Sequence, residues 1–183
     1  MRVQFIKTVS DIIKKDDRVV LLLGDIGVFG FRDLLSNYSD RAYNIGILEQ
    51  STVSVSAGLA LSGLIPIVHT IAPFLVERSL EQIKVDLCYQ ELGANLVSIG
   101  GSYDYAALGC THHCPADIPT LNEIPNIEII VPGHPKEFDK LFRQCYDNNS
   151  PTYYKLGATT NAQNYNVEFG KNLIIQEKGD TVI

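Results

Sequence analysis

Short runs of apolar residues recur along this chain, and they constrain its fold more than any other feature. The runs are VVLLL (19–23), AYNIGI (42–47), PIVHT (66–70), NLVSIG (95–100), IEIIV (127–131) and TYYKL (152–156). Runs that are apolar on both faces are typical of parallel strands covered by helices on each side. We therefore expect an α/β protein built on a doubly wound, mostly parallel sheet with helices on both faces.

Segments long enough for helices separate these runs. Apolar residues recur at helical spacing over 3–13, and further helices are expected at 49–62, at about 75–92 and at 135–147, where Pro135 suits a first helical position. Ligands of such folds bind at the carboxyl ends of the strands. The residues directly after each run are therefore the candidate site.

Composition excludes several classes of protein. The chain has 183 residues, 45% of them hydrophobic and 20% charged, which is typical of one soluble globular domain. A net charge of −6 without clustered Lys and Arg argues against a nucleic-acid or membrane partner. The apolar stretch 58–68 is too short for a bilayer, and the N-terminus lacks the pattern of a signal peptide, so we expect a cytoplasmic location. Four scattered cysteines predict free thiols.

The pattern changes after Leu156. Residues 157–166 (GATTNAQNYN) are polar, and 169–183 have the pattern of a short strand and a turn. A lone strand has no partner to bury against. We therefore expect one domain at 1–156, and at 157–183 a linker with the first strand of a truncated C-terminal domain.

Two motifs at the strand ends invite other interpretations. GDIG (24–27) suggests a phosphate-binding turn, but it lacks the spacing of a dinucleotide or P-loop fingerprint, and Asp25 also suits the cap of a tight turn. CTHHC (110–114) suggests zinc, but the segment offers no second pair of ligands at the spacing of a structural zinc site. We expect no metal site in this chain.

Glu49 comes after the run at 42–47 and opens a segment of small, almost uncharged residues, SVSAGLALSG (54–63). A glutamate in the first turn of a helix is stabilised by the helix dipole and needs no other role. The small residues, however, indicate a helix that is buried or packed against another subunit, and desolvation favours the protonated form of a carboxyl. Glu49 is therefore also a candidate for proton transfer near neutral pH.

Four blocks of the sequence resemble one known family. The blocks are NIGILEQ (44–50), SAGLALSGLIPIVHTIAPFLVERSLEQI (56–83), GCTHH (109–113) and IPNIEIIVPGHPKEF (124–138). In order and spacing they are similar to the pyrimidine-binding domain of transketolase-like thiamine diphosphate enzymes, over about 1–156. The resemblance implies the thiamine diphosphate-binding fold and thiamine diphosphate as the cofactor.

In that family the glutamate that matches Glu49 hydrogen-bonds N1′ of the cofactor pyrimidine and favours its imino tautomer, which takes the thiazolium C2 proton. The product is a nucleophilic ylid, so the resemblance implies that Glu49 activates the cofactor. It also implies that Phe74, with help from Leu75, packs on the pyrimidine; plain core packing is the alternative. Asp25 and Ile47 are the further cofactor-binding residues that we expect.

The resemblance further implies substrate contacts. His112 matches the imidazole that contacts substrate in the family, and with Glu49 it is an expected catalytic residue. Arg78 lies where the 1-deoxyxylulose-phosphate synthases carry a functional arginine, with a solvated helix charge as the alternative. His69, near the end of an apolar run, is the third expected substrate-binding residue.

The sequence departs from the family pattern at two points. Leu108 stands where sugar-phosphate transketolases carry an aspartate that contacts a substrate hydroxyl, and Asp104 lies a few residues upstream. The GDG motif and the Asn after it, which hold the diphosphate and Mg²⁺ in the family, have no match in this sequence. The resemblance therefore implies a separate N-terminal transketolase-like subunit that holds the diphosphate and Mg²⁺, in a homodimer or an α₂β₂ assembly.

We expect the chain to be a subunit of a transketolase-like enzyme that transfers a ketol (two-carbon) unit between sugars or related keto compounds. Its nearest alternatives are the β subunit of a 2-oxoacid dehydrogenase and a 1-deoxyxylulose-phosphate synthase-like enzyme; THH (111–113) favours a transketolase over the dehydrogenase. A non-catalytic assembly module is a further alternative, but a scaffold has no physical need for both Glu49 and His112. The small-residue segment 51–63 favours a homodimer, because two-fold packing would bury it.

Overall fold

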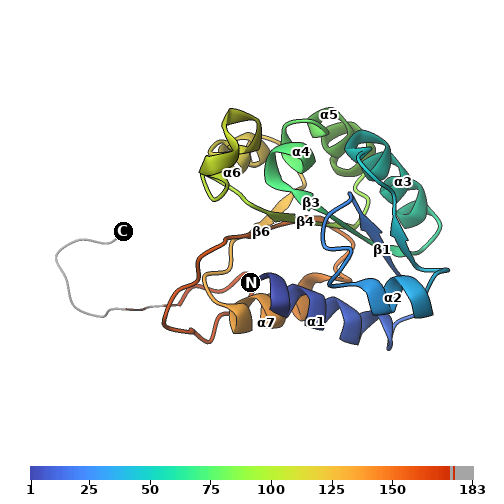
Figure 1. Cartoon of the computed structure of the whole chain (residues 1–183), viewed down its shortest axis with the longest axis horizontal. Helices are drawn as coiled ribbons and strands as arrows, with labels where there is room; N and C mark the ends of the chain where they lie inside the picture. Colours follow the sequence, from blue (N-terminus) through green and yellow to red (C-terminus); the bar gives the residue numbers. More distant parts are fainter. Residues whose placement is uncertain (174, 176–183) are drawn as a thin grey trace.

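The computed structural model describes residues 1–173 and 175, and these form one six-stranded sheet in the order β2-β1-β3-β4-β6-β5 (Figure 1). The strands are β1 (Val19–Leu23), β2 (Ala42–Asn44), β3 (Ile65–Ile71), β4 (Ala94–Ile99), β5 (Glu128–Ile130) and β6 (Pro151–Leu156). Every neighbouring pair is parallel. The sheet confirms the predicted α/β fold, and each strand overlaps one of the predicted apolar runs.

Helices cover both faces of the sheet (Figure 1). One face carries α1 (Arg2–Ile13), α2 (Arg32–Asn37) and α7 (Pro135–Cys145), and the other carries α3 (Glu49–Leu61), α4 (Ala72–Val76), α5 (Leu80–Gln82) and α6 (Asp117–Asn122). Each connection returns the chain to the same end of the sheet before the next parallel strand, so the carboxyl ends of the strands lie together. None of the helices in the described part of the chain is long and apolar enough to cross a membrane.

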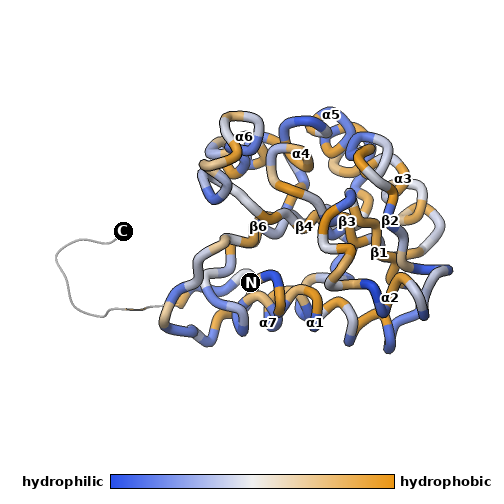
Figure 2. Tube along the Cα trace, viewed as in Figure 1, coloured by the Kyte–Doolittle hydropathy of each residue, from blue (hydrophilic) through white to orange (hydrophobic). Residues whose placement is uncertain are grey.

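Two apolar clusters hold these layers together. Phe5, Ile67 and Phe138 belong to the cluster beneath α1 and α7, whereas Val53 and Val68 belong to the cluster beneath α3. Neighbouring residues of β3 thus point to opposite faces, as the two-residue repeat of a strand requires. Figure 2 shows the apolar strands at the centre of the molecule. Burial on both faces explains why the strands are continuous apolar runs.

The helix predicted at about 75–92 is broken into α4, α5 and a π-helical turn, Ile83–Cys88. Ser79 lies at the break, where a φ of −114° takes it out of the helical conformation. Its hydroxyl donates to the carbonyl oxygens of Leu75 at 2.8 Å and Phe74 at 3.1 Å. Such bonds compete with the backbone hydrogen bonds of a helix. They account for the end of α4 at this point.

Residues 157–173 contain no helix or strand and run along α7. The backbone N–H of Tyr165 donates to Glu137 Oε1 at 2.9 Å, and Phe169 packs against the apolar cluster beneath α1 and α7. This segment is therefore attached to the domain, whereas the sequence analysis expected a linker. The part of the expected C-terminal strand at 174 and 176–183 lies outside the described residues.

Candidate active site

Glu49 is the first residue of α3, directly after the loop that connects β2 to this helix. Gly46 turns the chain in that loop with a φ of 84°, a conformation that favours glycine. Only 2% of Glu49 is exposed. Its carboxylate therefore lies at the positive end of a helix dipole and away from bulk water. This position suits both a helix-start charge and a group that transfers a proton, so the neighbours of Glu49 must distinguish them.

Arg78, just after α4, is the partner of Glu49. Its Nη1 donates to Glu49 Oε2 at 2.7 Å. The pair is asymmetric, because 37% of the arginine side chain is exposed but only 3% of the glutamate side chain. A charged donor at this distance stabilises the ionised carboxylate against the effect of burial.

Phe74 and His112 extend this contact. The guanidinium carbon of Arg78 lies 4.2 Å from the centre of the Phe74 ring. The Phe74 ring meets the His112 imidazole at a steep angle, with ring centres 5.2 Å apart. Glu49, Arg78, Phe74 and His112 thus form one continuous set of contacts, which we call the Glu49 cluster. The structure brings both predicted catalytic residues together through Arg78 and Phe74.

His112 lies in the loop between β4 and α6, which contains the 3₁₀ turns Ala106–Leu108 and Cys110–His112. Backbone groups of Ser102 and Cys114 pair across the base of this loop at 3.0 and 2.8 Å. Thr111 Oγ1 lies 3.0 Å from Nδ1 of His112 and restrains its ring. The loop is therefore closed at its base and holds His112 against Phe74.

A buried polar network supports the same loop. Asp117, fully buried at the start of α6, accepts from Lys155 Nζ at 2.8 Å and from the Tyr153 hydroxyl at 3.0 Å. Lys155 also donates to Ser102 Oγ at 3.0 Å, and the Tyr153 hydroxyl lies 2.7 Å from Ser98 Oγ. Burial, with the Asp117 carboxylate nearby, raises the pKa of Tyr153 well above its usual range. The sequence analysis missed this network, although Lys155 is the only charge in the run TYYKL.

Asp25 and Ile47 lie in the loops after β1 and β2, and Asn44 joins these loops. The side-chain oxygen of Asn44 accepts from the backbone N–H groups of Asp25 at 3.0 Å and Gly46 at 3.3 Å. Its amide nitrogen donates to Asp25 Oδ1 at 3.0 Å. Ile47 is exposed. Within the described residues no hydrogen bond or ion pair joins Asp25 or Ile47 to the Glu49 cluster, so their cofactor contacts stay predictions; Asn44 was not predicted at all.

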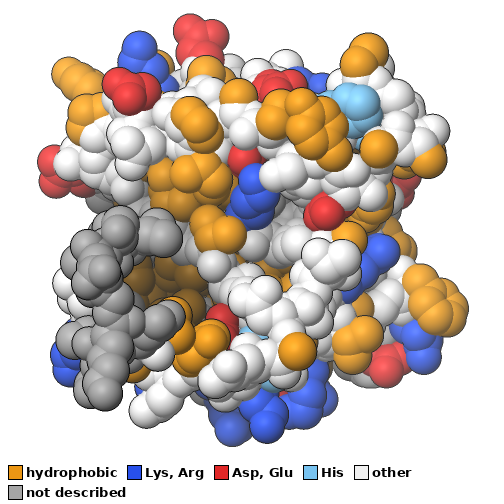
Figure 3. All heavy atoms as spheres, turned by 90° about the vertical axis from the view of Figure 1, so that its left-hand side faces the viewer, with side chains coloured by type: hydrophobic (Ala, Val, Ile, Leu, Met, Phe, Trp, Pro, Cys, Tyr) orange, Lys and Arg blue, Asp and Glu red, His pale blue; other side chains and the backbone are white. Residues whose placement is uncertain are grey.

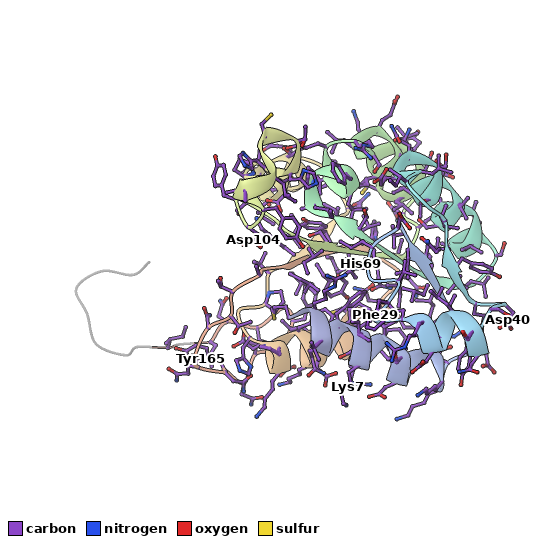
Figure 4. The ribbon with its side chains drawn as sticks, viewed as in Figure 1. Lys7, Phe29, Asp40, His69, Asp104 and Tyr165 are labelled. Atoms are coloured by element: carbon purple, nitrogen blue, oxygen red, sulfur yellow. The ribbon has the colours of Figure 1, made fainter. Side chains whose placement is uncertain are left out.

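His69 does not join the Glu49 cluster. It points from β3 toward α1, where its ring lies 4.6 Å from that of Phe5, and it is fully buried (Figure 4). Its Nδ1 lies 2.8 Å from the carbonyl oxygen of Val97, while Nε2 has no partner in the described part of the chain. Burial, with a smaller effect of Arg2, lowers the pKa of His69 to about 4. This position corrects the expectation that His69 contacts substrate, because β3 places it on the apolar face that it shares with Ile67.

The described residues contain no group of three or more His, Cys, Asp or Glu side chains placed to hold a metal ion. In the CTHHC segment, Cys110 is exposed and Cys114 is buried. Burial, with a smaller effect of the Glu77 carboxylate, raises the pKa of Cys114 to about 12. The two thiols therefore lie in different surroundings and do not form a pair.

The Glu49 cluster has groups that suit an aminopyrimidine ring. Glu49 Oε1 accepts no hydrogen bond within the described residues, so one oxygen of a buried carboxylate is free for a ring nitrogen. Phe74 adds an aromatic surface, and an open pocket of about 480 Å³ borders Arg78. Hydrophobic side chains also reach the surface on the side of the molecule shown in Figure 3. These residues fit the pyrimidine half of thiamine diphosphate.

Comparisons with known proteins point to the same cofactor family. Residues 1–156 match the family model described as transketolase, pyrimidine binding domain. An uncharacterized 33.6 kDa protein in the fasciation locus of Rhodococcoides fascians is 40% identical over 154 residues, which cover 84% of this chain and 49% of that protein. An apulose-4-phosphate transketolase subunit of Phocaeicola vulgatus is 34% identical over 157 residues, 85% of this chain and 50% of that protein. The chain thus spans about half the length of these curated relatives.

Solved structures share the fold. A split gene transketolase, described as an inactive beta4 tetramer, matches 87% of this chain and 51% of its own chain with a TM-score of 0.76 and 24% identity. A transketolase from Campylobacter jejuni matches 85% of this chain and 25% of its own, also with a TM-score of 0.76, at 17% identity. At these identities the likeness concerns the fold alone, and it agrees with the doubly wound architecture.

Proposed function

Because the chain belongs to the family of transketolase pyrimidine-binding domains, we propose that it forms the pyrimidine-binding part of a thiamine diphosphate-dependent, transketolase-like transferase. The reaction transfers a ketol (two-carbon) unit between sugars or related keto compounds. The Glu49 cluster is the observation that supports this proposal: a carboxylate with 2% exposure shares one set of contacts with an aromatic ring and a histidine. A helix-start charge alone would not require these neighbours.

Each residue of the cluster has a task in this proposal. Glu49 binds the pyrimidine through Oε1 and shares a proton with it, and burial keeps water from competing for that hydrogen bond. Phe74 packs on the ring and excludes solvent, and His112 contacts the substrate. When bound, the cofactor supplies the carbanion chemistry, while these residues orient it and move one proton.

A partner subunit completes the site in this proposal. The chain spans about half the length of its curated relatives, one of which is named as a subunit of a transketolase. The described residues hold no cluster of ligands for a metal ion. We therefore place the diphosphate and Mg²⁺ on a separate N-terminal transketolase-like subunit, with this chain in a homodimer or in an α₂β₂ complex with that subunit.

The loop that carries His112 bears on the substrate. Leu108, where the resemblance leads us to expect an aspartate, is 58% exposed. Asp104, labelled in Figure 4, is engaged elsewhere, because its Oδ2 accepts from the backbone N–H of Ala158 at 2.8 Å. An apolar side chain cannot hydrogen-bond a sugar hydroxyl. We therefore propose a substrate that differs from a standard pentose phosphate at this contact.

Glu49→Gln tests the proposed function in the complex of this chain with its partner subunit, thiamine diphosphate and Mg²⁺. Glutamine keeps the shape of the side chain but cannot exchange the proton, so we expect deuterium exchange at the cofactor C2 to slow by ~10²- to 10⁴-fold. Acid quenching followed by NMR measures this rate. Cofactor affinity, measured by calorimetry, should change little.

Glu81→Gln is the matched control, because Glu81 is an exposed carboxylate that borders the neighbouring pocket. It should exchange at the wild-type rate. If Glu49→Gln also exchanges at the wild-type rate, Glu49 is only a helix-start charge and the proposed function is wrong.

A further inference from the structure

The contact between Arg78 and Glu49 points to a role for the arginine that the sequence did not suggest. We infer that Arg78 is a positioning residue for the Glu49 carboxylate, and that it acts on the proton shared with the cofactor rather than on the substrate. This inference rests on the proposed function, because it concerns the same carboxylate.

Arg78 divides the two oxygens of that carboxylate. Its Nη1 binds Oε2 at 2.7 Å, and Oε1 accepts no hydrogen bond from the described residues. With 3% of the glutamate side chain exposed, little water is available to replace the arginine. One charged donor therefore restrains the rotation of the carboxylate and leaves Oε1 for a ring nitrogen.

The arginine is itself restrained at both ends. Its guanidinium lies over the Phe74 ring at 4.2 Å, a cation–π contact. Its backbone N–H donates to the carbonyl oxygen of Pro73 at 3.1 Å, and Ser79 ends α4 directly after it. Such restraint is what a positioning role requires, since a mobile cation would not fix the carboxylate.

The charge of Arg78 opposes the effect of burial on Glu49. Burial alone favours the neutral carboxylic acid, whereas a guanidinium in contact favours the carboxylate. When the carboxylate is favoured, the shared proton lies on the ring nitrogen, where the proposed function needs it. Loss of the Arg78 charge should therefore return the proton to Glu49 and slow exchange at C2.

A substrate contact is the competing role, because 37% of the Arg78 side chain is exposed and it borders the open pocket. Lys84, an exposed cation of the π-helical turn, borders the same pocket. It forms no ion pair with Glu49 within the described part of the chain. A comparison of these two cations therefore separates a general effect of charge from the specific contact with Glu49.

Arg78→Met keeps most of the side-chain length and removes the charge, and Lys84→Met is its matched control. Both are measured in the complex with the partner subunit, thiamine diphosphate and Mg²⁺, without substrate. We expect C2 exchange to slow by roughly tenfold or more in Arg78→Met, with a shifted pH profile, and to be unchanged in Lys84→Met. Arg78→Lys, which keeps the charge, should recover part of the rate. Unchanged exchange in Arg78→Met with a raised KM for substrate overturns the inference.

A second measurement needs neither cofactor nor partner. In the chain alone, the Tm values of Arg78→Met, Glu49→Gln and the double variant form a double-mutant cycle. The Arg78→Met loss in Tm should become much smaller when Glu49 is already Gln, because no buried carboxylate is then left unpaired. Additive losses would show that the two side chains do not depend on each other, and would contradict the inference.

The proposed function and the positioning role fail in different ways. If Glu49→Gln leaves C2 exchange unchanged, the proposed function fails whatever Arg78 does. If Glu49→Gln slows exchange but Arg78→Met does not, only the positioning role fails.

Discussion

Lys155 Nζ lies 2.8 Å from Asp117 Oδ1, in an ion pair that leaves 14% of the lysine side chain and none of the aspartate side chain exposed. The pair joins β6 to the start of α6, beneath the loop that carries His112. Taking these charges out of water is unfavourable unless each has its partner. The pair therefore matters less for its own strength than for the unpaired charge that its loss would leave behind.

Lys155→Met should lower the free energy of unfolding by about 3–5 kcal/mol, because it leaves the buried Asp117 carboxylate without its cation. Urea unfolding at neutral pH measures the loss. Lys136→Met, at an exposed position of α7, is the control and should change stability little.

The double variant Lys155→Met/Asp117→Asn should recover part of that stability, because asparagine is uncharged and can still accept from the Tyr153 hydroxyl. A loss in Lys155→Met no larger than that of an exposed ion pair, about 1 kcal/mol or less, would show that Asp117 is not held by this lysine.

His69 should make the fold less stable in mild acid. Burial lowers its pKa to about 4 in the folded chain, against an ordinary value of 6.5. Between these pH values the unfolded chain binds a proton that the folded chain does not, so the free energy of unfolding falls as the pH is lowered. The stabilisation is fully present above pH 6.5, and the loss approaches ~3 kcal/mol near pH 4.

Urea unfolding at a series of pH values between 4 and 7 checks this effect. His69→Gln lacks the titrating ring, so its stability should fall less steeply over this range than that of the wild type. All other groups titrate in both proteins, so the difference in slope belongs to His69. Parallel curves would mean that His69 is protonated in the folded chain.

Glu137→Ala should loosen the start of α7 and the segment after β6 together. One carboxylate oxygen accepts from the backbone N–H groups of Gly133 at 2.9 Å and His134 at 3.1 Å, and the other accepts from Tyr165 at 2.9 Å. Loss of these charge-assisted bonds should cost about 1–3 kcal/mol. Amide hydrogen exchange should accelerate at Tyr165 and Gly133.

Glu123→Ala, at an exposed position just after α6, removes a carboxylate without these contacts and is the control. If the Tyr165 amide exchanges equally fast in the wild type and in Glu137→Ala, the segment after β6 does not depend on Glu137.

The strands could be predicted because burial on both faces leaves a continuous apolar run. All five residues of β1 are buried, and the run VVLLL (19–23) records this directly. The helices α2 and α6 could not be predicted, since six residues are too few to show helical periodicity. The break at Ser79 depends on a side-chain hydrogen bond, which an apolar pattern does not record.

The candidate site could be predicted in part, because a parallel α/β sheet gathers the residues at the carboxyl ends of its strands. The pairings within the site could not. Arg78 is 29 residues from Glu49, and Lys155 is 38 residues from Asp117, and no periodicity relates such positions. The burial of His69, in contrast, could have been predicted from the alternation along its strand, which places it on the same face as Ile67.

The members of the Glu49 cluster come after different strands, and this fixes the order in which they can meet during folding. Glu49 comes after β2, Phe74 and Arg78 after β3, and His112 after β4. Pairing between parallel strands forms slowly, because long stretches of chain must first be closed into loops. A chain that has paired only β1, β2 and β3 can hold Glu49 against Arg78 but has no His112 beside Phe74. Completion of the sheet is therefore also completion of the site, and a partly folded chain emerging during synthesis cannot present all four residues to a cofactor.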